Sequence, residues 1–183
     1  MSVINDIDVQ ALEDTTAAVR ADPRLGRATF SVNGSWQGGC RLTAQTGALT
    51  LGGERDETRV ARYVMSSDEP AALLGTDSAV SPAEYLLHAL AGCYTVTLAA
   101  LASERGIQLK AYRLEVEGDI DLRGFLGVDS TIRPGLQRVR VRLHIDAPDS
   151  PRAQLEELVS LVENRSPIRD TLVSPVEVVT TLG

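Results

Sequence analysis

The feature that most constrains this chain is a long segment whose apolar side chains leave hardly any polar face. Residues 81–101 read SPAEYLLHALAGCYTVTLAAL, and apolar residues recur there on nearly every side of a helix. A helix that is apolar all round must be enclosed by protein. Because a chain of 183 residues encloses such a helix only with difficulty, we expect a second copy of the chain to cover one side of it.

The two ends of this helix are marked in the sequence. Ser81 and Glu84 have the spacing of a capping box, and Pro82 suits the first helical position. Gly106 is a natural residue to follow the last turn. We therefore predict a helix that begins after Ser81 and ends at residue 104 or 105.

Two segments after this helix predict a β-hairpin. Residues 112–122 alternate apolar with acidic side chains, and residues 136–146 alternate apolar with basic ones. In an antiparallel pair the acidic and basic rows face each other. We expect the arginine row to be neutralised in this way rather than to bind phosphate.

The remaining segments complete the prediction of an α+β fold, with antiparallel sheets around one long buried helix. A weak helical stripe over residues 3–21 predicts an N-terminal helical arm, residues 1–27, ahead of one domain, residues 28–183. Turn signals at Gly38 and Gly39 separate strand-like pieces. We expect short strands at 27–32, 36–44, 48–53 and 58–67, a second helix capped by Asp149 or Ser150, a short helical turn capped by Ser166, and a closing strand at 176–182.

Charge and composition limit the partners of the chain. Its formal net charge of -7 argues against binding to nucleic acid, which needs a basic surface. We find no run of about 20 apolar residues as a membrane span needs, and no basic segment followed by an apolar block at the start. We therefore expect a cytoplasmic protein that binds neither nucleic acid nor membrane.

The thiols are the remaining chemical candidates. The chain has two cysteines, Cys40 and Cys93, and a structural disulfide is not expected in a cytoplasmic protein. His88 and His144 do not combine with them into a metal-ligand spacing, and no phosphate-binding or dinucleotide-binding loop is present, so we expect no metal and no cofactor. Taken on the helix alone, Cys93 is most simply a packed core thiol.

The order of several short blocks changes this interpretation. The chain contains DEPAALLGTDSAVSPAEYLLHALAGC, and then GIQL, EGDIDLRGFLG, RPGLQRVRV, SPIRDTL and PVEVV. Over residues 28–182 this order resembles the osmotically inducible protein C (OsmC) and organic hydroperoxide resistance family. The resemblance implies an intertwined homodimer, in which long central helices are buried between sheets from both subunits.

The resemblance also implies a role for Cys93 in the oxidative-stress response. The family's first catalytic cysteine holds this place on the buried helix and attacks the O–O bond of a hydroperoxide as a thiolate. The resulting sulfenic acid condenses with a second cysteine, and a dithiol reduces the disulfide. An arginine of the first hairpin and a glutamate at the helix start polarise the thiolate.

The chain departs from the family's pattern at the partners of this thiol. Ser166 stands before Pro167 where the family has its second cysteine, and a hydroxyl cannot form a disulfide, so we interpret Ser166 as a helix cap. The family's glutamate directly follows the helix proline, where this chain has Ala83. Glu84 lies one residue further, so we interpret it first as a capping-box residue and second as the catalytic carboxylate.

The family's arginine has two matches in this chain. An ungapped comparison places Cys40 at its position, and a shift by one residue places Arg41 there. On a strand these two side chains face opposite ways, so only one would point at Cys93. We expect Arg41 to face Cys93; the alternative makes Cys40 the facing thiol that resolves the sulfenic acid.

Three functional hypotheses follow. The first is thiol-dependent reduction of organic hydroperoxides or related electrophiles, with Cys93 as nucleophile and an external thiol as reductant. The second is a non-enzymatic protein that binds a small apolar ligand in a pocket beside Cys93. The third is a purely structural thiol, which predicts that Cys93 is inert to alkylation.

Overall fold

The computed structural model describes residues 3–183, and the chain divides into two compact units. The helix unit combines the N-terminal residues through Val9 with residues 86–183, and the strand unit spans Gln10–Tyr85. The division expected from the sequence, an arm over residues 1–27 and a domain over residues 28–183, stays a prediction.

The strand unit contains two small antiparallel sheets. It begins with helix α1 (Val9–Ala21) and includes three short 3-10 helices, η1 (Pro23–Gly26), η2 (Glu57–Arg59) and η3 (Ala71–Leu73). The strand order of the first sheet is β3 (Ala28–Thr29), β6 (Leu49–Leu51) and β7 (Glu54–Asp56). The order of the second is β4 (Val32–Trp36), β5 (Leu42–Thr46) and β8 (Val64–Ser67).

The expected strand over residues 36–44 is wrong. Gly38 and Gly39 have φ values of 88° and 59°, in the left-handed region that interrupts a strand. The backbone N–H of Arg41 donates to the carbonyl of Gly38 at 3.2 Å and closes a turn between β4 and β5. Cys40 and Arg41 therefore do not lie on a strand, and the rule that their side chains face opposite ways does not apply to them.

A buried carboxylate organises the loop that precedes helix α2. The Asp68 side chain is 0% exposed. One of its oxygens accepts hydrogen bonds from the backbone N–H and hydroxyl of both Thr76 and Ser78, and the other accepts from the N–H of Glu69. Between these partners, Gly75 approaches so closely that a Cβ there would lie 1.7 Å from the carbonyl oxygen of Glu69. Asp68 thus satisfies the donors of a tightly folded loop.

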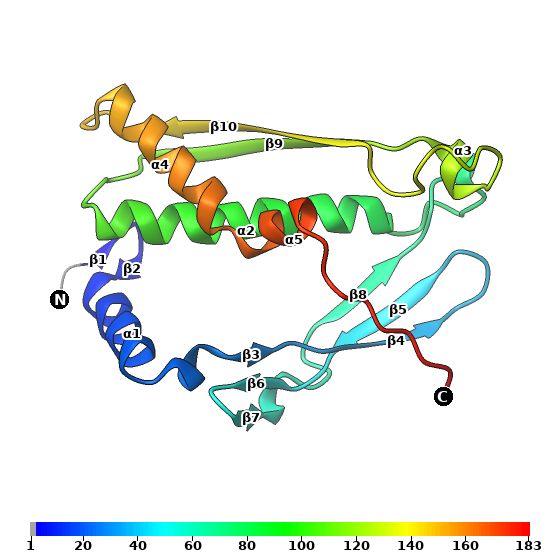
Figure 1. The fold of residues 1–183 in the computed structure, drawn as a ribbon, viewed down its shortest axis with the longest axis horizontal. Coiled ribbons are helices and arrows are strands. Elements are labelled where there is room, and N and C mark those ends of the chain that lie inside the picture. The colour runs from blue at the N-terminus through cyan, green and yellow to red at the C-terminus, as the bar shows by residue number, and fades with distance from the viewer. Residues whose placement is uncertain (1–2) are drawn as a thin grey trace. The chain divides into compact units, whose positions relative to one another are not determined.

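The helix unit is built on helix α2 (Pro82–Glu104), which begins in the strand unit and runs alongside a long hairpin (Figure 1). The hairpin pairs β9 (Ala111–Asp119) with β10 (Arg138–Asp146), and α3 (Leu122–Phe125) lies in the connection between them. Two helices follow, α4 (Arg152–Arg165) and α5 (Pro167–Val173). The buried core consists of Leu90, Tyr94, Leu98, Leu101, Ala102, Ile107, Ala147, Leu158 and Val162.

The structure confirms the predicted ends of α2. The N–H of Ser81 donates to the Glu84 carboxylate at 2.9 Å, and the N–H of Glu84 donates to the Ser81 hydroxyl at 3.2 Å. After the last turn Gly106 has a φ of 67°, and the N–H of Ile107 donates back to the carbonyl of Ala102 at 2.8 Å. A capping box thus begins the helix and a left-handed glycine ends it.

The predicted pairing of the acidic and basic rows is also confirmed. In the register of the hairpin Arg140 lies opposite Glu117, and Arg142 lies opposite Glu115. The Arg142 guanidinium lies 3.3 Å from the Glu115 carboxylate. All of these side chains point away from the core, on the alternate positions of their strands.

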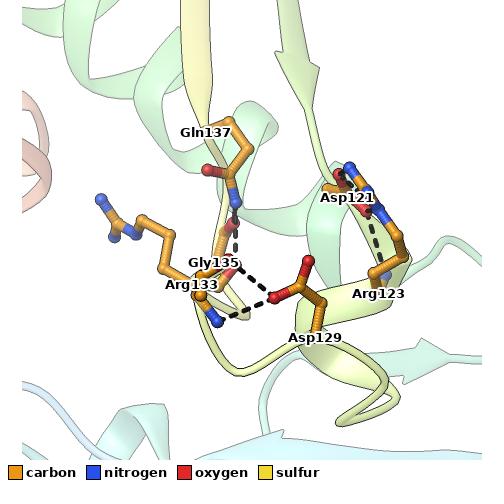
Figure 2. A network of polar contacts seen from close by, with 7 residues as sticks. Asp121, Arg123, Asp129, Arg133, Gly135 and Gln137 are labelled. Carbon is orange, nitrogen blue, oxygen red and sulfur yellow. Dashed lines mark hydrogen bonds and ion pairs between the residues drawn. The ribbon is translucent and has the colours of Figure 1, made fainter.

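Short-range polar contacts hold the connection between β9 and β10 (Figure 2). Asp121 caps α3 and forms a two-pronged ion pair with Arg123. Asp129 accepts from the N–H and hydroxyl of Thr131, and the Gln137 amide donates to the carbonyls of Arg133 and Gly135. These contacts give the connection a defined shape although most of its side chains are exposed.

The start of the chain differs from the helical stripe expected over residues 3–21. Strands β1 (Val3–Ile4) and β2 (Ile7–Asp8) form a tight hairpin because Asn5 and Asp6 adopt left-handed φ values of 53° and 60°. The Asn5 side chain then donates to the hydroxyl of Ser103 and accepts from the N–H of Leu109 at 2.8 Å. This hairpin therefore docks on the end of α2, and helix begins only at Val9.

Two expectations near the end of the chain are also wrong. Pro151 is the N-cap residue of α4 and forms no side-chain hydrogen bond, whereas Asp149 or Ser150 was the expected cap. Residues 174–183 contain no strand, although 176–182 is rich in β-branched residues that favour one. Their apolar side chains are exposed, and a strand needs a partner edge that this segment does not find within the described chain.

The expectation that the chain does not bind a membrane stays a prediction. Among residues 3–183, one helix, α2, is long and apolar enough to cross a membrane by length and composition. A single such helix is weak evidence, because the core helix of a water-soluble protein satisfies the same criteria.

Candidate functional site

Helix α2 places Cys93 between its buried and exposed faces. Leu90, Tyr94 and Leu98 are buried in the core at helical spacing. Because Cys93 directly precedes Tyr94, its side chain lies beside the row of buried residues and not within it. It is half-buried. The exposed face of α2 begins next to Cys93 and carries Val96, which is 70% exposed.

A serine hydroxyl completes the near surroundings of this thiol. Ser166 begins α5 as its N-cap and accepts a hydrogen bond from the N–H of Arg169 at 3.3 Å. Its oxygen also lies 3.1 Å from the sulfur of Cys93. The structure thus confirms Ser166 as a helix cap, and adds a contact with Cys93 that the sequence pattern did not predict.

An apolar groove opens beside Cys93. It has a volume of about 490 Å³. Gly92 lies at the groove, and a Cβ built on it would meet no atom within 4 Å, so that no side chain crowds this approach to the thiol. The lining residues are Gly92, Cys93, Val96, Thr97, Ala100, Leu101, Glu104, Arg165 and Pro167.

Charged side chains lie at the end of the groove that is furthest along α2 from Cys93. Glu104, on the last turn of the helix, lies 3.9 Å from the guanidinium of Arg165 and 4.0 Å from that of Arg105. The groove therefore offers an apolar stretch beside the thiol and an ionic rim at its end. A small organic molecule with an apolar body fits this lining better than a sugar or a nucleotide does.

Tyr94 is the buried ionisable neighbour of this site. Burial raises the pKa of its hydroxyl, and the nearby Glu163 carboxylate raises it further. Tyr94 therefore stays neutral at physiological pH and serves as a packing residue beside Cys93.

The Glu84 carboxylate is engaged in the cap of α2. Its hydrogen bonds with the N–H and hydroxyl of Ser81 lower its pKa, so that it is ionised at neutral pH. The capping interpretation of Glu84 is confirmed. The catalytic role that the family resemblance assigns to it stays a prediction.

The two candidates for the family's arginine position lie on the turn between β4 and β5. The Arg41 guanidinium donates to the carbonyls of Gln37 and Gly38 in its own turn. The exposed thiol of Cys40 lies 3.7 Å from the carbonyl oxygen of Leu74. Both residues belong to the strand unit, and which of them faces Cys93 stays a prediction.

Comparison with known families decides what kind of protein carries this site. The family model described as OsmC-like protein matches residues 75–181, more than half of the chain. The chain belongs to the OsmC family. Cys93, the groove and Ser166 all lie within the matched segment of this OsmC-family chain. No curated protein matches the sequence.

Solved structures of other family members share the fold. An OsmC-like protein from Mycoplasma pneumoniae has a TM-score of 0.62 at 19% identity, over 80% of this chain and 89% of its own. A Legionella pneumophila protein named as organic hydroperoxide resistance protein OsmC has a TM-score of 0.56 at 16% identity, over 80% and 90%. The organic hydroperoxide resistance protein OhrB of Bacillus subtilis has a TM-score of 0.51 at 18% identity, over 81% and 93%. The mixed α+β fold with antiparallel sheets and a long helix is therefore the family's fold.

Proposed function

We propose that this OsmC-family protein is a thiol-dependent reductase of organic hydroperoxides or related electrophiles, with Cys93 as its nucleophile. The observation that carries the proposal is the position of the Cys93 sulfur, between an apolar groove of about 490 Å³ and the Ser166 hydroxyl at 3.1 Å. The groove supplies space for an organic group, and the hydroxyl supplies polarity at the sulfur.

The proposed first step consumes one hydroperoxide. The Cys93 thiolate attacks the terminal oxygen of R–O–O–H, a new S–O bond forms and the O–O bond breaks. The leaving alkoxide takes up a proton and departs as the alcohol, while Cys93 becomes a sulfenic acid. The sulfur is oxidised by two electrons and the peroxide is reduced by two.

The family supports this chemistry. Two of the three structural relatives described above are named organic hydroperoxide resistance proteins, and this chain belongs to the same family. An arginine and a glutamate that polarise the thiolate belong to the family's pattern, and we retain Arg41 and Glu84 as the candidates for these roles. A role in the oxidative-stress response, in the cytoplasm, accords with this proposal.

A homodimer is part of the proposal. The face of α2 that carries Val96 is apolar and exposed within the described chain, and a second copy would cover part of it and form an outer wall of the groove. Exclusion of water from the groove would favour an organic substrate over solvent at the sulfur. The unpaired segment 174–183 and the free edges of the β9–β10 hairpin are the elements through which two copies could intertwine.

Peroxide consumption tests the proposal. The wild-type protein should consume cumene hydroperoxide catalytically with dithiothreitol as reductant, and Cys93→Ser should lose this activity. The matched control is Cys40→Ser, which removes the other thiol and should keep the activity if Arg41, rather than Cys40, serves Cys93. Consumption by Cys93→Ser at the wild-type rate would refute the proposal.

The second candidate function is binding of a small apolar ligand without catalysis. The apolar lining of the groove favours it, since binding needs the groove but not the thiol. In that case an apolar fluorescent probe should bind the wild type and Cys93→Ser equally, while neither protein consumes hydroperoxide. If the reductase proposal holds, Cys93→Ser should bind the probe and fail only in turnover.

A further inference from the structure

The contact between Ser166 and Cys93 has a direction that the neighbouring hydrogen bonds fix. The N–H of Arg169 donates to the Ser166 oxygen at 3.3 Å. Because a backbone N–H can only donate, the serine oxygen is the acceptor in that bond. The hydroxyl hydrogen then remains for the other neighbour of Ser166, the Cys93 sulfur at 3.1 Å. Ser166 is 1% exposed, so bulk solvent does not compete for this hydrogen.

We propose that Ser166 is a positioning residue for Cys93, whose hydroxyl donates to the sulfur and stabilises the thiolate that attacks. A hydrogen bond donated to the charged form of a group favours that form, and such bonds are stronger than neutral ones. The cap of α5 holds the hydroxyl in place, so the donor costs no reorganisation when the sulfur becomes charged. For its role in peroxide reduction this inference rests on the proposed function.

The same residue sets the second half of the reaction. A serine oxygen cannot accept the sulfenic sulfur in a disulfide, and Cys93 is the one cysteine among the described residues of the helix unit. With Arg41 rather than Cys40 facing Cys93, as we expect, the sulfenic acid of Cys93 waits for a thiol from solution. That thiol forms a mixed disulfide with Cys93 and releases water, and a second thiol regenerates the Cys93 thiol and leaves as a disulfide.

The groove supplies the route for this external thiol. Gly92 leaves open space beside Cys93, whereas Ser166 closes the site on its own side, because it is buried. A small-molecule thiol thus reaches the sulfur along the apolar lining that also admits the hydroperoxide. Ser166 makes this a site that works with one cysteine, in place of the family's pair.

Alkylation of Cys93 tests the positioning role without any peroxide. In a Cys40→Ser background, Ser166→Ala should lower the rate of alkylation by iodoacetamide at neutral pH by roughly threefold to tenfold. Loss of the donated hydrogen bond removes one stabilising contact of the attacking thiolate, so alkylation slows. Ser166→Thr keeps both the hydroxyl and the helix cap, and should restore the rate.

The matched control separates the donor from the cap. Asp121→Ala also removes a side-chain helix cap, at the start of α3, but removes no contact with the Cys93 sulfur. It should leave the alkylation rate near the wild-type value. Equal rates for wild type and Ser166→Ala, or a Ser166→Thr variant as slow as Ser166→Ala, would overturn the inference.

A second variant keeps the inference falsifiable if Ser166→Ala fails to fold. Ser166→Cys places a sulfur where the oxygen now lies, close to Cys93, and cumene hydroperoxide should convert the introduced thiol and Cys93 into an intramolecular disulfide. The parent protein should instead accumulate a sulfenic acid that dimedone traps. Absence of the disulfide in an oxidised Ser166→Cys variant would show that the two side chains do not face each other. Alkylation that depends on Ser166 in a protein that consumes no hydroperoxide would overturn the proposed function and leave the positioning role intact.

Discussion

Arg140 of strand β10 lies opposite Glu117 of strand β9 and forms ion pairs with two carboxylates. Its guanidinium lies 3.1 Å from the Glu117 carboxylate. It also donates two hydrogen bonds to the Asp119 carboxylate, one of them at 2.8 Å. The pair with Asp119 raises the pKa of Arg140 further above its ordinary value and lowers the pKa of Asp119. The basic row of the hairpin is thus neutralised locally.

Reversal of this charge should affect stability but not the thiol. Arg140→Glu places a third acid beside Glu117 and Asp119, so the thermal unfolding midpoint should fall modestly, and by less at high salt than at low salt. The alkylation rate of Cys93 should stay near the wild-type value. Arg152→Glu, which removes an isolated surface pair with Glu156, is the control and should have a smaller effect. A large loss of Cys93 reactivity in folded Arg140→Glu would point instead to an anion site on β10.

Asp68 should make stability depend on acidity. Hydrogen bonds, above all from Thr76, hold the pKa of Asp68 well below its ordinary value of 3.8. Because the folded-state pKa is depressed, this stabilisation is complete above about pH 4 and is lost as the pH falls toward the folded-state value. Asp68→Asn should therefore lower the unfolding midpoint strongly at pH 7, and the difference from wild type should shrink below about pH 4.

The control for this prediction is a similar but more exposed aspartate. Asp129 also accepts from a backbone N–H and a hydroxyl, both of Thr131, but it is only half-buried. Asp129→Asn should cost less at pH 7. If the unfolding midpoints of wild type and Asp68→Asn differ by the same amount at pH 7 and at pH 3, the role assigned to the Asp68 charge is contradicted.

The N-terminal hairpin should contribute to the stability of the end of α2. Asn5→Ala removes the hydrogen bonds with Ser103 and Leu109 and puts alanine at a left-handed φ of 53°. We expect a loss of about 1–3 kcal/mol in the free energy of unfolding. Asn5→Gly removes the same hydrogen bonds without backbone strain, so the difference between the two variants measures the strain. Wild-type stability in both would show that the hairpin does not dock in solution.

The dimer should depend on the exposed face of α2. Val96→Glu introduces a charge at its centre, and light scattering should then return the mass of one chain where the wild type returns two. Val128→Glu is the matched control, because Val128 is 72% exposed compared with 70% for Val96 but lies in the β9–β10 connection; it should stay dimeric. A stable, folded wild-type monomer at micromolar concentration would remove the proposed dimer.

The parts of the fold that the sequence predicts are those whose signals are local. Pro82–Glu104 and the β9–β10 hairpin have a strong periodicity and marked ends, and the structure confirms both. The segment around Cys40 and Arg41 was misjudged because two successive glycines turn the chain, and alternation alone does not distinguish a strand from a turn at this length. Residues 176–182 are rich in β-branched residues that favour a strand, but composition does not provide the partner edge that a strand needs.

The candidate site was predicted in its residue types and not in its geometry. The family resemblance selected Cys93 and drew attention to Ser166 as the place of the missing cysteine. Their contact joins residues 73 positions apart. A repeating pattern of side chains along the sequence does not predict which residues so far apart meet. The charged rim of Glu104 and Arg165 was missed for the same reason, since the two lie on different helices, α2 and α4.

Identification of the product on Cys93 after one equivalent of organic hydroperoxide tests the central claim most directly. The protein is treated with cumene hydroperoxide in the absence of added thiol, trapped with dimedone and analysed by mass spectrometry of its peptides. We predict a dimedone adduct on Cys93 and an unmodified Cys40, because Ser166 cannot resolve the sulfenic acid. A Cys40–Cys93 disulfide would show that Cys40 is the resolving thiol, against our expectation for Arg41. An unmodified Cys93 would contradict the reductase proposal and leave the binding of an apolar ligand as the function of the groove.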